Sequence, residues 1–410
     1  MTDAVTRAET AEAAMRDLFP ATPCQRNAYL SDRFGADVWL KREDLTPVRS
    51  YKLRGAFNAM RKLSGGRVAC ASAGNHAQGV AWMCNHLGMD GVIFMPVTTP
   101  GQKIDKTRLF GGDHVEIRLT GDFFDDTLAT AKAFCAETGA HFLSPFDDDD
   151  VIEGQAAVAV ELMRQIPEPP DLIVVPVGGG GLSAGMLSYL RATQAPVEMR
   201  YVEPLGGASL MAALAEGAPV TLDGLDNFVD GAAVARIGDR PFAILRNIPP
   251  QHVLRVPENR VCITMQELLN IEGIVLEPAG ALSVDALRDL GPEIEGRRVL
   301  CVTTGGNFDF ERLPDVKERG MRFAGTKKYY VLRMPQRPGA LREFLDALGP
   351  QDDIARFEYL KKSARNFGTV LIGIESPHPE AFDRLQSRMD ALGFAWQDLT
   401  SNPMLSELVI

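Results

Sequence analysis

The sequence predicts an α/β protein built on a parallel sheet with helices on both faces, followed by a smaller α+β unit. Between about residues 65 and 305, short runs rich in β-branched residues alternate with stretches whose apolar residues recur at helical spacing. Near-continuous apolar strands that alternate with helices are typical of a parallel sheet buried on both faces. After residue 312 the order of the expected elements changes, which indicates a second domain.

The composition is that of an ordinary folded protein and excludes several classes. The 410 residues are 45% hydrophobic and 24% charged, which suffices for a large core. Lys and Arg number 43 against 54 Asp and Glu, and no basic run stands out, so we expect no nucleic-acid partner. We expect no membrane span, because no apolar stretch reaches about 18 residues. The six cysteines form no C-x-x-C pair and no zinc-type cluster, which predicts reduced thiols, a cytoplasmic location and no metal site.

The expected elements follow one another in a regular order. The first 19 residues lack the apolar core of a signal peptide and are interpreted as an amphipathic helix. Strands are expected at residues 67–72, 91–97, 114–120, 171–178, 198–202 and 297–301, and helices at 75–88, 102–112, 125–139 and 182–192. Ligands of such sheets bind at the carboxyl ends of the strands, so the strand-to-helix turns are where a functional site is expected.

The C-terminal part predicts a domain of its own. Residues 314–328 are charged and lack apolar periodicity, which indicates a linker. Six elements are expected after it: strand 328–335, helix 336–349, strands 355–362 and 368–376, helix 379–393 and strand 394–399. The order β-α-β-β-α-β is that of the ferredoxin-like unit.

Lys52 is the first candidate for chemistry. It follows an acidic turn and opens a predicted helix, where a positive charge is unfavourable for the helix dipole. A lysine that is partly removed from water at such a place can lose its proton and form a Schiff base. A solvated surface lysine is the alternative interpretation, and this motif alone does not decide between them.

A second candidate motif lies where the strand at residues 67–72 turns into a helix. Ser72, Ala73 and Gly74 are small and expose backbone N–H groups at a helix N-terminus, which suits an anion such as a substrate carboxylate. The Asn75 amide can donate to an oxygen of a ring cofactor. Ser72 or Asn75 acting as a plain helix cap is the alternative. His76 has no evident acidic partner, so we expect it to be structural.

Two further motifs follow predicted strands. The third motif consists of Gly178, Gly179, Gly180, Gly181 and Leu182. Four glycines at a strand-to-helix turn let backbone N–H groups close around a phosphate. The dinucleotide spacing G-x-G-x-x-G fails at Ser183, although an acid, Glu203, follows at a suitable distance. The fourth motif, residues 302–307, offers a hydroxyl at a strand end, which suits a heteroaromatic nitrogen but by itself is only a turn.

Two acidic features of the sequence are interpreted as structural and not as parts of a functional site. The four adjacent acids at residues 147–150 are more typical of a solvated loop than of a cation site. Glu277 stands directly before Pro278, which is ordinary chemistry for a helix start, so we assign it no cofactor role.

Together and in this order, the motifs KREDLTPVRSYKLRGA, SAGNHAQG, VGGGGLSAG and TTGGN resemble those of the β-family (fold type II) of pyridoxal-phosphate enzymes. With the C-terminal unit, the chain is similar to the shorter biosynthetic threonine dehydratases (threonine ammonia-lyases) that carry one regulatory domain. The resemblance implies two parallel-sheet subdomains like those of tryptophan synthase β, the smaller inserted at about residues 50–150. It places a catalytic domain that uses pyridoxal 5'-phosphate at residues 1–320 and an ACT-like regulatory domain at 326–410.

The resemblance implies a role for each motif. Lys52 is the catalytic residue and Schiff-base lysine, Asn75 contacts the 3-oxygen of the ring, and Thr304 faces the pyridine nitrogen, where relatives commonly have serine. The cofactor phosphate is bound by Gly178, Gly179, Gly180, Gly181 and Leu182, and the substrate carboxylate by Ser72, Ala73 and Gly74. Ala156 and Ala157 depart from the Gly-Thr that relatives often show.

The activity implied is the α,β-elimination of L-threonine to 2-oxobutanoate and ammonia, the first step of isoleucine biosynthesis, in a homo-oligomer (a tetramer or a dimer). Isoleucine inhibition and valine relief are implied for the regulatory domain. The alternatives are an L-serine or threo-3-hydroxyaspartate dehydratase, a serine racemase-like enzyme, an inactive amino-acid sensor and a nicotinamide oxidoreductase. The appended domain favours the pathway enzyme, because feedback control needs a second site.

Overall fold

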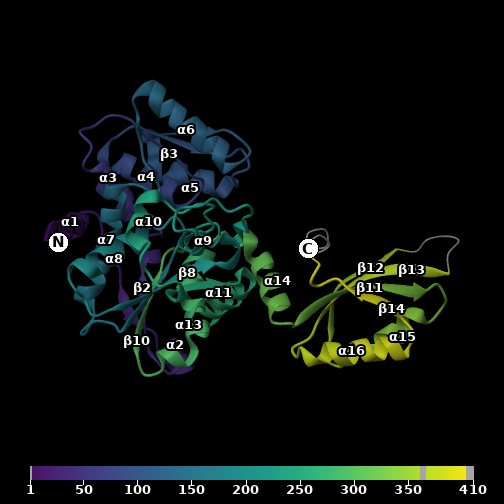
Figure 1. Cartoon of the computed structure of the whole chain (residues 1–410). Helices are drawn as coiled ribbons and strands as arrows, with labels where there is room; N and C mark the ends of the chain where they lie inside the picture. Colours follow the sequence, from purple (N-terminus) through teal and green to yellow (C-terminus); the bar gives the residue numbers. More distant parts are fainter. Residues whose placement is uncertain (1, 361–365, 403–410) are drawn as a thin grey trace. The chain divides into compact units, whose positions relative to one another are not determined.

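The computed structural model describes residues 2–360 and 366–402 and shows two units, Met1–Phe310 and Glu311–Ile410 (Figure 1). The first unit contains two sheets that are formed mainly by parallel pairing. The second contains an antiparallel sheet. Both the α/β class of the first part and the β-α-β-β-α-β order of the last part are confirmed.

The larger sheet of the first unit has the order β1-β2-β10-β7-β8-β9. Its strands are β1 (Cys24–Arg26), β2 (Asp37–Arg42), β7 (Leu172–Pro176), β8 (Glu198–Pro204), β9 (Val253–Val256) and β10 (Arg298–Thr303). All neighbours pair in parallel except β1, which is antiparallel to β2. Strands β7 and β10 lie side by side in the middle and are buried almost throughout, as their apolar sequences predict.

The smaller sheet has the order β5-β4-β3-β6, with every pair parallel. Its strands are β3 (Val68–Ala71), β4 (Gly91–Met95), β5 (Val115–Leu119) and β6 (His141–Phe142). Helices α4 (Asn75–Leu87), α5 (Gly101–Gly111) and α6 (Phe124–Thr138) connect them. The whole sheet therefore comes from one continuous stretch of chain, drawn in blue in Figure 1.

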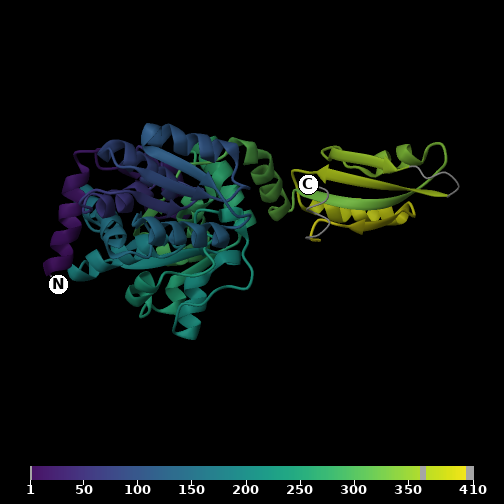
Figure 2. The ribbon, with the colours of Figure 1, turned by 90° about the horizontal axis from the view of Figure 1, so that it is seen from above.

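The remaining helices of the first unit follow in chain order. They are α1 (Thr2–Met15), α2 (Ala28–Phe34), α3 (Lys52–Met60), α7 (Asp149–Gln165), α8 (Gly181–Ala192), α9 (Ser209–Glu216), α10 (Asp239–Leu245), α11 (Glu258–Glu272), α12 (Pro278–Asp285) and α13 (Leu287–Leu290). The apolar side chains of α3 pack in one core with the smaller sheet and α4. The N-terminal helix α1, drawn in purple in Figures 1 and 2, packs on α7 and α8 and places Ala8 in their apolar core. The short 3₁₀ turn η1 (Glu43–Leu45) follows β2.

The second unit begins with helix α14 (Leu313–Phe323), where we expected a linker. Val316, Glu318 and Gly320 of this helix are buried, while Phe323 at its end is exposed. The strands β11 (Lys327–Pro335), β12 (Asp353–Leu360), β13 (Phe367–Glu375) and β14 (Ala395–Asp398) and the helices α15 (Ala340–Ala347) and α16 (Glu380–Ala391) follow. The sheet order is β12-β13-β11-β14, and both helices pack on one face (Figure 1). The expected strand at 355–362 ends in residues 361 and 362, which lie outside the described residues.

No helix among the described residues combines the length and apolarity that crossing a bilayer requires. All six cysteines lie in described parts of the chain and are free thiols.

A network of buried charges joins the N-terminal segment, β2, η1, α3 and α7. Arg54 of α3 has a fully buried side chain and donates to Glu43 at 2.7 Å and to Glu161 at 2.7 Å. The buried ammonium of Lys41 donates to Glu161 at 2.6 Å. The Thr22 hydroxyl donates to Glu43 at 2.6 Å, so the carboxylates are also hydrogen-bonded. Because removing one partner leaves a buried charge uncompensated, this network constrains how these elements pack.

We expect Glu161→Gln to lower the free energy of unfolding by about 3–5 kcal/mol, because the substitution keeps the shape and leaves Lys41 and Arg54 under-neutralised. The matched control is Glu116→Gln, which breaks an exposed pair with Arg118 and should cost about 0–1 kcal/mol. Urea unfolding followed by circular dichroism measures both values. Equal, small decreases in the two variants would show that the buried network does not contribute this much to the free energy of unfolding.

The same carboxylate predicts a pH dependence. Burial raises the pKa of Glu161, but Arg54 and Lys41 outweigh it and lower the pKa from 4.5 to about 2. A group with a depressed folded-state pKa stabilises the fold above its unfolded pKa and loses that contribution as the pH falls through the folded pKa. The stability difference between wild type and Glu161→Gln should therefore shrink as the pH falls from 4.5 to about 2. A difference that stays constant over this window would refute the assignment.

Candidate active site

Lys52 is the first residue of α3, as the sequence predicts. Its Nζ donates to the carbonyl oxygen of Pro145 at 2.8 Å and lies 5.3 Å from the ring centroid of Tyr51 and 5.8 Å from that of Phe146. Burial lowers the pKa of Lys52 to about 8, against the opposing effect of Glu277. A substantial part of this amine is therefore neutral near pH 8, which is the state that nucleophilic chemistry requires.

The four glycines form the turn between β7 and α8. Gly180 has a φ of +88°, in the left-handed region that favours glycine. A Cβ at Gly179 would lie 2.1 Å from the Phe146 ring, and one at Gly180 would lie 2.8 Å from Pro241, so neighbouring side chains press directly on the loop. No amide of Gly178, Gly179, Gly180 or Gly181 donates to another described residue. These free N–H groups at a helix N-terminus fit a phosphate.

Ser72, Ala73 and Gly74 form the turn between β3 and α4 and are all partly exposed. The expectation that all three backbone amides are exposed is wrong, since the Ser72 amide donates to the carbonyl oxygen of Phe94 at 3.0 Å and the Gly74 amide donates to the Ser72 hydroxyl at 3.2 Å. Gly74 is the residue before the first turn of α4. Asn75 is therefore inside the helix and is not its cap, so the plain-cap alternative for Asn75 is wrong. Leu182, one residue into α8, has a buried side chain, so only its backbone amide is suited to an anion.

The turn after β10 lies against the start of α3. The Tyr51 amide donates to the carbonyl oxygen of Thr304 at 3.1 Å, and Ser50 and Gly305 form a β-bridge. The hydroxyl of Thr303 lies within hydrogen-bonding distance of the Lys41 carbonyl oxygen and the Asp44 carboxylate, and is part of the scaffold. The Thr304 side chain is buried, and among the described residues its hydroxyl makes no hydrogen bond, so it is available to a ligand.

Glu277 is a site residue that the sequence interpretation missed. It does precede α12, as expected, but its buried carboxylate accepts a hydrogen bond of 2.6 Å from Asn75 Nδ2. Burial and Asp230 raise the pKa of Glu277 to about 7. A Cβ at Gly305 would lie 2.2 Å from Glu277 Oε1, so the carboxylate also touches the turn after β10. The only signal in the sequence was an acid before proline, which is common at helix starts.

Asn307 and Lys106 were also missed. Asn307 Nδ2 donates to Asn75 Oδ1 at 2.6 Å and to the Val48 carbonyl oxygen at 2.8 Å, and its Oδ1 accepts from Lys106 Nζ. Asn307 is the last residue of the fourth motif, but nothing in the sequence indicates a role for its side chain.

The structure brings the four motifs into one neighbourhood at the carboxyl ends of β3, β7 and β10. Lys52 and the glycine loop meet at residues 145 and 146, and the residue before Lys52 touches Thr304. Asn75 meets the turn after β10 through Glu277. Ligands of open α/β sheets bind at the carboxyl ends of the strands, so this is where a ligand site is expected.

The other singled-out residues have structural partners. His76 is buried, its Nε2 lies 3.0 Å from the carbonyl oxygen of Leu143, and burial lowers its pKa to about 3. Asp148 caps α7 by accepting from the amides of Asp150 and Val151. Glu203 accepts from two amides at the start of α9, and burial raises its pKa to about 7. No group of three metal-ligating side chains occurs in the described part of the chain.

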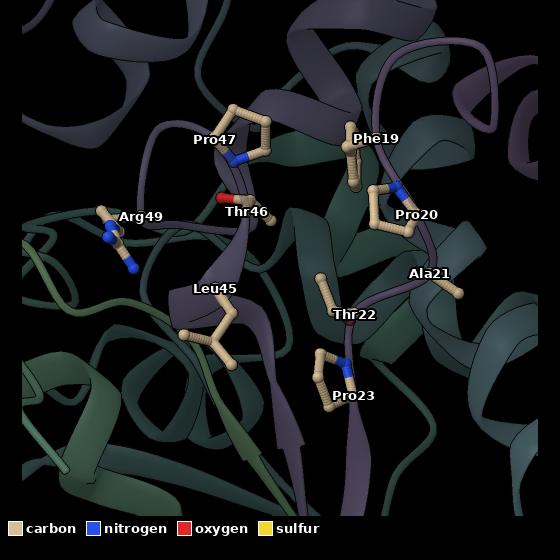
Figure 3. A pocket seen from close by; sticks show the side chains of 9 residues that line it. All are labelled: Phe19, Pro20, Ala21, Thr22, Pro23, Leu45, Thr46, Pro47 and Arg49. Carbon is tan, nitrogen blue, oxygen red and sulfur yellow. The ribbon is translucent and has the colours of Figure 1, made fainter. Parts of the chain in front are cut away.

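A pocket of about 300 Å³ lies beside the loop that leads to α3 (Figure 3). It is lined by Phe19, Pro20, Ala21, Thr22, Pro23, Leu45, Thr46, Pro47 and Arg49. None of the predicted site residues lines it. Its walls are mainly proline and other apolar side chains and include no candidate nucleophile with a perturbed pKa, so we place the chemistry at Lys52 instead.

Two family models match the sequence. Residues 15–305 match the pyridoxal-phosphate dependent enzymes, and residues 318–409 match the C-terminal regulatory domain of threonine dehydratase. The chain is 46% identical over 401 residues to the biosynthetic L-threonine dehydratase of Bacillus subtilis (strain 168), covering 97% of this chain and 95% of that protein. It is 43% identical over 410 residues to that of Lactococcus lactis subsp. lactis (strain IL1403), covering 98% of each.

A solved structure supports the fold. The processed form of threonine deaminase isoform 2 from Solanum lycopersicum superposes with a TM-score of 0.72 at 34% identity. The match covers 78% of this chain and 94% of that chain.

Proposed function

Since the chain belongs to the pyridoxal-phosphate-dependent enzymes, in the family of the biosynthetic threonine dehydratases, we propose that it deaminates L-threonine to 2-oxobutanoate and ammonia, the first step of isoleucine biosynthesis. The expected cofactor, pyridoxal 5'-phosphate, and the expected class, a carbon–nitrogen lyase, are confirmed by this membership. The observation that carries the proposal is the partly neutral Lys52 beside a glycine loop whose amides are free.

The site fits the cofactor. Lys52 is the amine that would hold it, and the amides of Gly178, Gly179, Gly180, Gly181 and Leu182 would hold its phosphate. Asn75 would donate to the ring's 3-oxygen, and Thr304 would offer its hydroxyl to the ring nitrogen. Ser72, Ala73 and Gly74 would hold the substrate carboxylate at the partly exposed turn before α4, Ser72 through its hydroxyl because its amide is bonded to the carbonyl oxygen of Phe94.

The bound cofactor supplies an electron sink for the carbanion that forms at the substrate's α-carbon. Lys52, when its amine is neutral, accepts the α-proton, and its lowered pKa keeps that state populated. The rings of Tyr51 and Phe146 flank the amine. Thr304 is neutral and places no negative charge against the ring nitrogen, so it does not favour protonation there. The β-hydroxyl takes up a proton and leaves as water, and hydrolysis of the resulting enamine gives 2-oxobutanoate and ammonia.

L-Serine is the second substrate candidate, since it carries the same β-hydroxyl. The relatives named as L-threonine dehydratases at 43–46% identity favour threonine over serine, over 3-hydroxyaspartate and over a racemase. The family match and the intact Lys52 disfavour an inactive sensor or a nicotinamide enzyme. A coupled assay for 2-oxo acid over the three amino acids ranks them.

The second unit is the proposed regulatory domain. We propose domain limits of 1–320 and 326–410, a smaller subdomain at about residues 50–150, isoleucine inhibition with valine relief, and a homo-oligomer that is a tetramer or a dimer. The match to a regulatory domain over 318–409 supports the role. Six free thiols support a cytoplasmic location.

An effector site is proposed at the turn that enters α15. Gly339 has a φ of +88° immediately before this helix, and Leu341 and Leu345 are exposed on it. Backbone amides beside an apolar helix face suit a small apolar amino acid, because the amides can bind its carboxylate and the helix face can contact its side chain. An effector alters catalysis only if it binds two states of the enzyme unequally.

We expect Lys52→Ala and Lys52→Arg each to lower 2-oxobutanoate formation from threonine by at least about 10²–10⁴-fold, because alanine removes the amine and arginine does not deprotonate. The control is Lys62→Ala, whose exposed ammonium pairs with Asp150 and Glu153 beyond the end of α3. Ordinary threonine activity in either Lys52 variant would refute the assigned catalytic role.

We expect Gly339→Val to weaken inhibition by isoleucine at least about fivefold, because a β-branched residue is strained at this φ and its side chain fills the open space beside the turn where the effector is proposed to bind. Gly393→Val is the control for strain alone, since Gly393 has a φ of +71° in the same unit and nothing lies within 4 Å of its Cβ position. Threonine titrations with and without isoleucine measure the response. Equal weakening in both variants, or a full-length enzyme that ignores isoleucine and valine, would exclude an effector site at this turn.

A further inference from the structure

Four polar side chains, which include Asn75 and Glu277 of the candidate site, form a continuous chain of hydrogen bonds. Lys106 Nζ on α5 donates to Asn307 Oδ1, after β10. Asn307 Nδ2 donates to Asn75 Oδ1 at 2.6 Å, and Asn75 Nδ2 donates to Glu277 Oε1 at 2.6 Å. The chain runs from α5, through the turn after β10 and the start of α4, to the residue before α12.

The direction of these hydrogen bonds is fixed at both ends. An ammonium group can only donate, so Lys106 requires the oxygen of the Asn307 amide to face it. The Val48 carbonyl can only accept, so it requires the NH₂ group of Asn307 on the other side. Asn75 must then accept through Oδ1, which leaves its Nδ2 as the donor group. Glu277, when ionised, accepts from that group and completes the series.

The placement of Lys106 is unusual for a lysine. Among the described residues it makes no salt bridge, whereas Lys103, one turn earlier on the same helix, pairs with Asp230 at 2.6 Å. Lys106 is half-buried, and burial lowers its pKa. Its hydrogen-bond partner is a neutral amide oxygen, and the attraction of Glu277 does not outweigh the effect of burial on its pKa, so this placement is unfavourable for stability alone. A contribution to the orientation of that amide accounts for the arrangement.

We infer that Lys106, acting through Asn307, is a positioning residue that holds the Asn75 amide with its NH₂ group available to the cofactor. This inference rests on the proposed function, in which Asn75 donates to the ring's 3-oxygen. Asn75 Nδ2 carries two N–H bonds, one of which is used by Glu277. The reversed amide would present an oxygen to the electron-rich 3-oxygen, and two acceptors repel.

Three substitutions separate the direction of the hydrogen bonds from simple packing. Lys106→Met keeps the length of the side chain but cannot donate, whereas Lys106→Arg can only donate. Asn307→Asp is isosteric and still accepts from Lys106, but it cannot donate to Asn75, so Asn75 loses its oriented partner. Lys103→Met is the matched control, because it removes a cation of the same helix that lies outside the chain of hydrogen bonds.

The experiment measures the dissociation constant of pyridoxal phosphate by dialysis of the full-length protein, together with the absorption maximum of the bound cofactor and the KM and kcat for threonine. We expect Asn307→Asp and Lys106→Met to weaken cofactor binding by about tenfold or more and to shift the absorption maximum. Each variant removes a hydrogen bond that orients the Asn75 amide, which is the proposed donor to the 3-oxygen of the cofactor. Lys106→Arg and Lys103→Met should stay within about twofold of wild type. Thermal unfolding of the cofactor-free proteins checks that each variant folds.

Unchanged binding and absorption in both Asn307→Asp and Lys106→Met would overturn the inference while leaving the proposed function standing. An equal weakening in Lys103→Met would also overturn it, because the effect would then follow from any disturbance of α5. If Lys106→Met unfolds, Asn307→Asp alone decides, since it preserves the shape and the hydrogen bond with Lys106. A wild-type chain that binds no pyridoxal phosphate would instead overturn the proposed function, and the inference with it.

Discussion

The neutralisation of Arg54 inside the protein determines where Lys52 lies. Arg54 follows Lys52 by less than one turn of α3, and its guanidinium is held by Glu43 after β2 and by Glu161 of α7. Any packing of α3 that separated these groups would leave a charge buried without a partner, at a cost of about 3–5 kcal/mol. The helix is therefore fixed to the larger sheet at the turn where the lysine begins it. The perturbed pKa of Lys52 follows from that placement.

The candidate site uses this fixed helix together with three strand ends. The glycine loop after β7 leaves its amides free, and neighbouring side chains occupy the positions where a Cβ would be, so a larger residue does not fit there. The turn after β10 is held to the start of α3 by backbone contacts, and the turn after β3 is held to Glu277 through Asn75. Parts of the chain about 200 residues apart thus contribute single groups to one place, as in other open α/β sheets.

Patterns that are local in sequence were predicted well from it. Strands β3, β4, β5, β7, β8 and β10, the glycine turn and the start of α3 each depend on neighbours within a few residues, whereas β1, β2, β6 and β9 were not predicted. Glu277, Asn307 and Lys106 were not predicted, because their significance lies in partners 201 or 202 positions away or on another element. The helix α14 was not predicted, because its few apolar residues lie far apart in a charged segment. The burial of Val316 is visible only in the structure. The role of Thr304 came from resemblance, and its free hydroxyl is consistent with that role.

The central claim is that α3 delivers Lys52, and no other lysine, to the cofactor. Borohydride reduction of the full-length protein with bound pyridoxal phosphate, followed by digestion and mass spectrometry, tests this directly, since reduction makes the link between the cofactor and its lysine permanent. The account predicts a phosphopyridoxyl group on the peptide that contains Lys52 and on no other peptide. A modification on Lys103 or Lys106, or bound cofactor that reduction leaves unattached to any lysine, would contradict it.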